Sequence, residues 1–296
     1  MLWLSRRYST IVWAKAQKGI TKVRCRSCAS ISPRIAASIF AVSLRSFRNP
    51  MDMAKAVREN VVVIPISGKT KMQFDDVILG RRSIRGYKPD PVPAELIREI
   101  LALAMRAPSS MNTQPWNFYV ITGAPLDRIR RGNTERNLAG VPHSREFRIG
   151  QPFAGVHRER QIGVAKQLFS AMEIARDDKE RRQDWVMRGF RQFDAPVCVI
   201  ITYDRVLASS DDTAFDCGAV ATALVNAAWS RGLGAVINSQ GIMQSPVVRE
   251  HAGIADDQVI MKSIALGWPD DSFPANAVVS ERKSVEDATT FVGFGG

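Results

Sequence analysis

A continuous apolar run, VCVIIT at residues 197–202, is the feature that most constrains what this chain can fold into. The run has the length of a β-strand and lacks the alternation of polar and apolar residues that marks a strand with one wet face. A strand of this kind is covered on both faces. We therefore expect residues 197–202 to form an interior strand, in which Cys198 is a buried free thiol.

Two helices are expected before this run. Residues 74–79 form a short helix that ends at Gly80. Residues 94–106 place apolar side chains at the spacing of one buried helical face, and Pro108 ends that helix. A strand at residues 117–122 follows a polar loop. Trp116, at the start of that strand, is expected to pack in the core.

Further elements are expected later in the chain. In the middle region the clearest helical segment is residues 162–175. Residues 211–231 begin with two acids and are rich in alanine, with a glycine at position 218, which predicts a helix that another element can approach closely. It contains Cys217, a second buried thiol. Residues 259–266 read as a final strand.

The net charge of +12 is concentrated at the start of the chain. Residues 1–60 contain twelve lysines and arginines against Asp52 and Glu59, so they carry +10 of the total. The remainder is close to neutral and offers no bulk electrostatic argument for binding nucleic acid or a membrane surface. An alternative hypothesis, from a different functional class, is a basic arm that binds a polyanion. It predicts salt-dependent binding that disappears when residues 1–60 are removed.

Residues 1–70 are interpreted as a basic extension that is disordered or not translated, and residues 71–296 as the folded domain. The extension has the composition of an organelle transit peptide, and translation from Met51, Met53 or Met72 is the plainer alternative. No apolar run approaches the roughly 20 residues of a membrane-spanning helix. With two thiols expected to be free, a cytoplasmic location is favoured, and organelle targeting by residues 1–50 stays open.

The common catalytic signatures do not occur in this sequence. It contains no glycine-rich dinucleotide loop, Walker loop, zinc-protease helix or serine-hydrolase elbow. Cys25 and Cys28 have the spacing of half a zinc site, but no second pair of ligands follows. The three histidines are scattered in polar contexts, where surface positions account for them. We expect no metal site.

Three polar segments stand out instead. The turn R-R-S-x-R at residues 81–85 can grip a phosphate with arginine forks and a hydroxyl. The loop P-S-S-x-N-x-Q-P-W at residues 108–116 gathers hydrogen-bonding side chains between two prolines. The turn N-S-Q-G at residues 238–241 follows an apolar strand, and its glycine allows close approach to a ligand. Taken alone, the first segment is equally compatible with a solvated basic turn and the third is compatible with a simple turn, whereas local structure gives no reason for so many polar groups at residues 108–116.

Together these segments resemble the FMN-dependent nitroreductase family. The resemblance covers residues 74 to the C-terminus and includes the small-residue helix followed by G-L-G and a late Gly-Trp-Pro with Arg282 downstream. It implies an α+β fold, an α-β-α sandwich with a central, mostly antiparallel mixed sheet, and an intertwined homodimer with two FMN sites between the subunits.

The resemblance also assigns residues to the flavin site. Arg81 and Ser83, assisted by Arg282, would hold the phosphate and ribityl end of FMN, and Arg82 would contribute at least its backbone. Arg85 would lie near the flavin N1 and C2 carbonyl, where it would stabilise the negative charge of the reduced flavin.

The partner subunit and a second turn would complete this site. The partner would close it with Pro108, Ser109, Ser110 and Asn112. The backbone of Gln240 and Gly241 would face N5; family members often carry Glu where this chain has Gln240, which leaves the role of that side chain open. Gln114 has no assigned role.

The implied activity is reduction of nitroaromatic compounds by NAD(P)H in alternating half-reactions. The same fold and cofactor also suit quinone or enone reduction, reductive dehalogenation or flavin breakdown. These reactions would be distinguished by the acceptor pocket, in residues 133–191, which the sequence does not decode. The expected partners are a second copy of the chain and a small aromatic substrate, with neither nucleic acid nor membrane.

Overall fold

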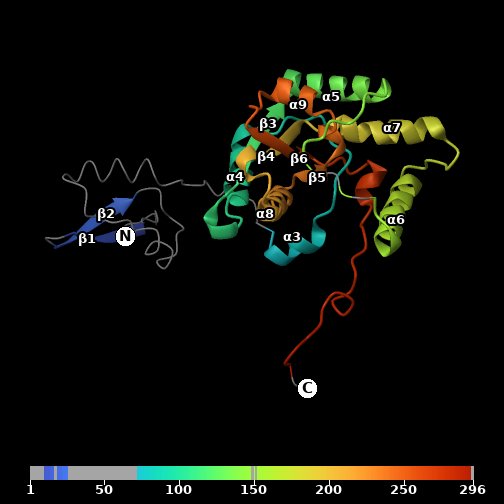
Figure 1. The fold of residues 1–296 in the computed structure, drawn as a ribbon. Helices are drawn as coiled ribbons and strands as arrows, with labels where there is room; N and C mark the ends of the chain where they lie inside the picture. Colours follow the sequence, from blue (N-terminus) through green and yellow to red (C-terminus); the bar gives the residue numbers. More distant parts are fainter. Residues whose placement is uncertain (1–9, 17–18, 26–71, 148–149, 151, 295–296) are drawn as a thin grey trace, which may run out of the picture. The chain divides into compact units, whose positions relative to one another are not determined.

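The protein is described from a computed structural model that covers residues 10–16, 19–25, 72–147, 150 and 152–294. The chain divides into two compact units, residues 1–67 and 68–296. In the first unit, β1 (Thr10–Ala16) pairs antiparallel with β2 (Gly19–Cys25) (Figure 1). The rest of the predicted extension, including Cys28, lies outside the described residues, and its interpretation stays a prediction.

A four-stranded antiparallel sheet forms the centre of the second unit. Its strand order is β3 (Trp116–Thr122), β4 (Val197–Asp204), β6 (Gln258–Gly267) and β5 (Gly234–Asn238). The apolar run at residues 197–202 is fully buried in β4, as its lack of alternation predicts. Most of β6 is equally buried, so two adjacent strands make up the interior of the sheet.

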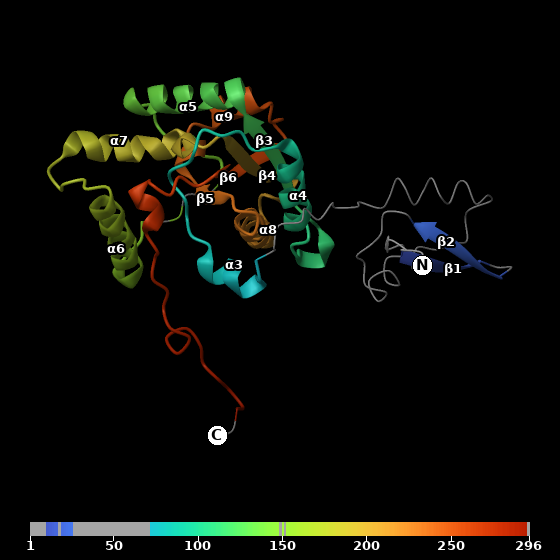
Figure 2. The ribbon, with the colours of Figure 1, turned by 180° about the vertical axis from the view of Figure 1, so that it is seen from behind.

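Helices cover both faces of this sheet. α4 (Ala94–Ala104) and α8 (Asp211–Trp229) pack on one face, where they share an apolar core with β4 and β6. α5 (Gly123–Leu138) and α9 (Ser245–Ala252) pack on the other face. Figures 1 and 2 show these layers from opposite sides. The predicted α+β sandwich is confirmed.

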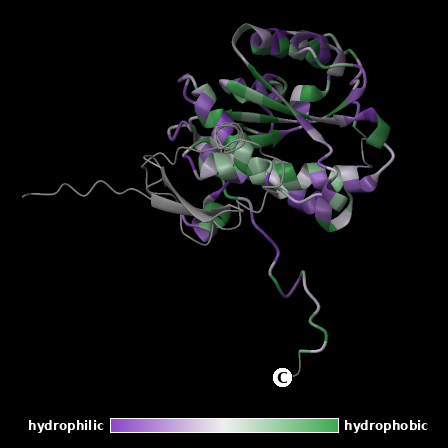
Figure 3. Cartoon of the chain, turned by 90° about the vertical axis from the view of Figure 1, so that its left-hand side faces the viewer, coloured by the Kyte–Doolittle hydropathy of each residue, from purple (hydrophilic) through white to green (hydrophobic). Residues whose placement is uncertain are grey.

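Three shorter or peripheral helices complete the domain. α3 (Phe74–Gly80) lies near α8, and α7 (Lys179–Phe190) contacts α5. α6 (Gly155–Ala171) begins earlier and ends earlier than the helix expected at residues 162–175. It cannot continue through Glu173, which adopts a left-handed backbone with φ 53°. Figure 3 shows apolar residues along the sheet, and the C-terminal segment leaves the domain as an extended chain.

The small residues of α8 are divided between two sides of the helix. Ala221 and Ala228 are buried in the core with Leu224, where they let α4 and the sheet lie close to the helix axis. Gly218 and Thr222 are exposed, and Phe215 is 79% exposed. One face of α8 thus belongs to the core, while an adjacent stripe of small and apolar residues is accessible.

Candidate functional site

The turn at residues 81–85, called the arginine-serine turn below, runs along the free edge of the sheet. Ser83 forms an isolated parallel bridge with Ala235 of β5, and the Ile84 N–H donates to the Ala235 carbonyl at 3.1 Å. Ile84 is buried, and a Cβ added at Gly234 would lie only 2.6 Å from its side chain. The close approach of these two backbones therefore depends on a glycine at position 234.

Arg81 and Arg282 approach each other without an acidic partner. Burial lowers the pKa of Arg81, and the charge of Arg282 lowers it further. Among the described residues neither guanidinium forms an ion pair, and Arg282 donates only to oxygens of Ser280 and to the Glu281 carbonyl. Guanidinium groups without an acidic partner are chemically suited to bind an anion such as a phosphate, which is the role predicted for Arg81 and Arg282.

Arg82 has a structural environment. Its guanidinium lies 5.4 Å from the centre of the Trp229 ring, and its Nε donates to the Asn276 carbonyl at 2.6 Å. This side chain is therefore occupied inside the chain, and the contribution of Arg82 to a flavin site stays a prediction.

Arg85 is held in place through its backbone. Its N–H donates to Asn276 Oδ1 at 2.7 Å, and its carbonyl accepts from Arg188 Nη2 at 2.9 Å. Among the described residues the side chain donates only to the Ser83 carbonyl, at 3.3 Å, and burial lowers its pKa. Because an arginine stays charged under these conditions, Arg85 presents a largely desolvated positive charge that no described carboxylate neutralises.

The turn after β5 is supported by a buried amide network. Asn238 accepts from the Gln240 N–H at 3.0 Å and donates to Gln192 Oε1 at 2.9 Å. The Gly241 carbonyl accepts from Gln192 Nε2 at 3.0 Å and from Asn133 Nδ2 at 2.8 Å. Since the Gln240 N–H is used within the turn, the backbone contact expected for a flavin here rests on Gly241.

The loop at residues 108–112 is pre-organised. Met111 and Asn112 adopt left-handed backbone conformations, with φ 47° and 60°. The Ser110 N–H donates to Asp216 Oδ2 at 3.1 Å, and Asp216, on α8, is only 3% exposed. Sequence reasoning missed Asp216, because a helical acid near an N-terminus has an ordinary explanation.

Gln114, which the sequence left without a role, organises the same loop. Its N–H donates to Ser109 Oγ at 3.0 Å. Its side-chain amide donates to Asn112 Oδ1 at 3.1 Å. Because the Asn112 oxygen is occupied, the Asn112 NH₂ group is the part of that side chain available to donate to a ligand.

One chain does not bring these two halves of the predicted site together. The arginine-serine turn contacts Trp229 at the C-terminal end of α8, through Arg82. The loop at residues 108–112 is bound to Asp216, thirteen residues earlier on the same helix. At 1.5 Å of rise per residue, these anchor points are about 20 Å apart.

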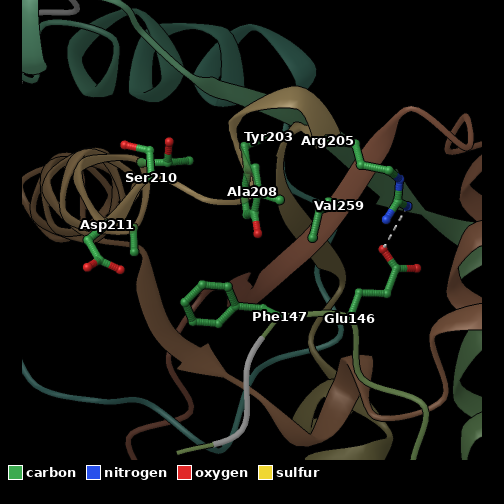
Figure 4. A pocket seen from close by; sticks show the side chains of 10 residues that line it. Glu146, Phe147, Tyr203, Arg205, Ala208, Ser210, Asp211 and Val259 are labelled. Atoms are coloured by element: carbon green, nitrogen blue, oxygen red, sulfur yellow. Dashed lines mark ion pairs between the residues drawn. The ribbon is translucent and has the colours of Figure 1, made fainter.

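A separate pocket of about 330 Å³ lies near the N-terminus of α8 (Figure 4). Glu146, in its wall, accepts from Arg249 Nη2 at 2.7 Å and from the Ile260 N–H at 2.9 Å, and Arg205 lies 3.9 Å away. This pocket contains none of the predicted flavin residues. Among the described residues, no cluster of three potential ligands could hold a metal ion, and no helix is long and apolar enough to cross a membrane.

Comparison with known proteins identifies the family of this chain. The sequence model of the Nitroreductase family matches residues 78–268. This span includes the arginine-serine turn, the loop at residues 108–112 (the serine-asparagine loop) and the turn after β5. The chain belongs to the nitroreductase family. The family predicted from the sequence is thereby confirmed.

Individual relatives of this nitroreductase-family protein are similar to it over about three quarters of the chain. Nitrobenzene nitroreductase from Ectopseudomonas oleovorans is 38% identical over 74% of this chain and 96% of its own length. A 4-nitrobenzoate reductase from Nocardioides sp. is 31% identical over 74% of this chain and 90% of its own length. The crystal structure of the FMN-dependent nitroreductase NfnB from Mycobacterium smegmatis in complex with NADPH superposes with a TM-score of 0.69, at 28% identity, over 74% of this chain and 97% of that one.

Replacing Asp216 by Ala is expected to loosen the serine-asparagine loop of this nitroreductase-family protein. The Ser110 N–H would lose its acceptor. Losing a hydrogen bond to a charged group would destabilise this loop conformation by about 1.5–3 kcal/mol. We expect FMN affinity, measured by fluorescence titration, to fall roughly tenfold or more. Asp212→Ala, at an exposed position on the same helix, is the matched control, and an equal loss in both variants would contradict the positioning role.

Proposed function

We propose that this protein is an FMN-dependent oxidoreductase that uses NAD(P)H to reduce nitroaromatic compounds. The observation that carries the proposal is the set of desolvated, unneutralised arginines along the edge of the sheet, Arg81 and Arg85, with Arg282 nearby. Burying an unpaired charge is unfavourable, so such groups are retained where a ligand supplies the opposite charge. FMN carries both a phosphate and a ring edge that becomes negative on reduction.

The residues present fit the parts of FMN. Arg81 and Arg282 would hold the phosphate, with Ser83 beside them. Ile237 is 44% exposed although its neighbours on β5 are buried, and it shares a sheet face with Ala235. An exposed apolar side chain on an otherwise buried strand suits the flat face of a flavin. The same strand leads to Gly241, where a contact to the flavin ring is expected.

The bound flavin would supply the hydride chemistry, and the protein would supply binding, orientation and electrostatics. Arg85 would place its positive charge at the N1 and C2 carbonyl edge, where a fixed charge in a partly dry site is more effective than one in water. The Asn276 and Arg188 contacts would keep this group in position before the reaction begins. No acid-base residue is needed for this role.

A homodimer is part of the proposal. The anchors of the two halves of the predicted site lie about 20 Å apart along α8, which supports a site completed by the serine-asparagine loop of a second chain. Exposed apolar residues near both halves support such an interface, with Leu79 83%, Phe215 79% and Met111 96% exposed. A cytoplasmic location also belongs to the proposal, supported by the buried thiols of Cys198 and Cys217, whose pKa burial raises to about 12.

The absorption spectrum of the purified protein tests this function directly. We expect yellow protein, bleaching on anaerobic titration with NADH or NADPH, and return of the colour when a nitroarene is added. A panel with a quinone, an enone and a halogenated arene would separate the alternative acceptor reactions. Colourless protein that cannot be reconstituted with FMN would refute the proposal.

A further inference from the structure

A lysine lies at an unexpected place beside the proposed flavin site. Lys262 is a partly buried charge on β6, between strand neighbours that are all buried. It shares a sheet face with Ile264 and Leu266, which pack against α8, and it pairs in register with Ile201 of the same core. Ile237 is exposed on this same face of the sheet.

Ser239 is the cross-strand neighbour of Lys262. Asn238 pairs with Ser263 at the end of β5, so the next pair in an antiparallel register is Ser239 and Lys262. Their side chains meet, with Lys262 Nζ donating to Ser239 Oγ at 2.6 Å. Ser239 directly precedes Gln240, and consecutive Cα atoms are about 3.8 Å apart, so this pair adjoins the turn expected to face the flavin N5.

Arg145 brings a second positive charge to the same side, because the N–H of Ser144 before it donates to the Met243 carbonyl at 2.9 Å, just after the turn at residues 240–242. Burial lowers the pKa of Lys262, and the charge of Arg145 lowers it further. The Nε atom of Arg145 is buried and has no hydrogen-bond partner among the described residues. Neither cation forms an ion pair in the described part of the chain.

The nearby carboxylate does not neutralise this pair. Glu146 follows Arg145 in the chain, but both of its oxygens accept from Arg249 Nη2, at 2.7 and 2.8 Å, and one of them also accepts from the Ile260 N–H. Burying two cations that repel each other costs free energy, and so does leaving their hydrogen-bond donors without acceptors. A ligand that brings an anion removes both costs. An apolar residue at position 262 would have completed the buried strand without this penalty.

We propose that Lys262, Ser239 and Arg145 form a subsite for the anionic oxygens of a ligand that binds over the flavin, and that this ligand is a nitroarene carrying a carboxylate. A carboxylate accepts charge-assisted hydrogen bonds from an ammonium and a guanidinium together. The subsite rests on the proposed function, because it adjoins the turn assigned to the flavin. The phosphate of NADPH has the same chemistry, and the experiment separates the two sources.

The test compares two acceptors and two nicotinamide donors in the holoenzyme. Nitrobenzene and 4-nitrobenzoate differ only in the carboxylate, and NADH and NADPH differ only in a phosphate. For Lys262→Met, we expect the ratio of kcat/KM for 4-nitrobenzoate to that for nitrobenzene to fall about 10- to 100-fold, which is the size of one charge-assisted hydrogen bond. Lys166→Met, exposed on α6, is the matched control and should leave this ratio unchanged.

Other outcomes have definite meanings. A fall in the NADPH to NADH ratio, with the acceptor ratio unchanged, would overturn the assignment to a nitroarene carboxylate and place the donor's phosphate at this site. Ratios that both stay at their wild-type values in a folded Lys262→Met protein would overturn the subsite itself. Ser239→Ala, which keeps the lysine, provides a second variant if Lys262→Met does not fold, and a smaller fall in the same acceptor ratio is expected.

Two further readouts separate failure of the subsite from failure of the proposed function. Wild-type protein that binds no FMN or reduces neither acceptor would refute the function. Binding of benzoate, followed as a change in the flavin absorption spectrum, does not depend on turnover. Benzoate binding that is equally tight in wild-type protein and Lys262→Met would refute the subsite while leaving the function intact.

Discussion

Arg85→Ala is expected to keep FMN bound and to slow its reduction by NAD(P)H about 100- to 1000-fold, the loss found when one pre-organised charge-stabilising group is removed. The backbone contacts of Arg85 with Asn276 and Arg188 do not involve its side chain, so the turn should keep its path in the variant. The phosphate contacts expected from Arg81 should also persist. Stopped-flow measurement of flavin bleaching, with flavin content determined separately, checks both parts of this prediction.

Two comparison variants sharpen the Arg85 experiment. Arg98→Ala removes an exposed arginine of α4 whose ion pair with Glu95 is solvent-accessible, and it should change neither flavin content nor reduction rate. Arg81→Ala should show the opposite balance, with weaker FMN retention and a smaller effect on the reduction rate of the flavin that stays bound. If Arg81→Ala and Arg85→Ala lost flavin and rate to the same extent, the separate roles would be wrong.

Mixing two inactive variants is expected to restore about a quarter of the wild-type activity, because a symmetric dimer with shared sites allows complementation. One variant carries Arg81→Ala and Ser83→Ala, and the other carries Ser109→Ala and Asn112→Ala. Each homodimer has a defect in both sites. In a randomly formed heterodimer, one site collects both defects and the other site has none.

The reason for expecting complementation is the distance between the two halves within one chain. The anchors at Trp229 and Asp216 are about 20 Å apart along α8. Co-refolding the two variants and measuring NAD(P)H oxidation with a nitroarene gives the result, and separately refolded samples mixed afterwards serve as the control. If co-refolded protein stays inactive although heterodimers form, each site would have to lie within a single chain.

The strands and some of the helices could be predicted from the sequence because their signals are local, whereas α5, α7 and α9 were not predicted. The apolar run at residues 197–202 became the buried β4, and the amphipathic pattern at residues 94–106 became α4. The helix expected at residues 162–175 was displaced because its end depends on the left-handed backbone of Glu173, which no periodicity encodes. Trp116, expected in the core, is 5% exposed.

The candidate site could be predicted only in part. The motif residues were recognisable as a set, since arginines, serines and an asparagine in turns have few structural reasons to occur together. The residues that hold these motif residues in place could not be recognised from the sequence. Gln114 and Asp216 act through contacts with residues that are near in space, and Gln114 contacts Asn112 in a loop that is left-handed at Met111, Asn112 and Gln114.

The interior strands, the motif residues and the family can be recognised from the sequence, because apolar periodicity and short motifs are properties of neighbouring residues. Which charges lack a partner becomes apparent only in the folded chain. Arg81, Arg85 and Lys262 look like any other basic residues in the sequence, and they differ because folding removes them from water without bringing a carboxylate to them. Desolvation and pairing are relations between distant parts of the chain, so they arise only when the sheet and its helices have packed.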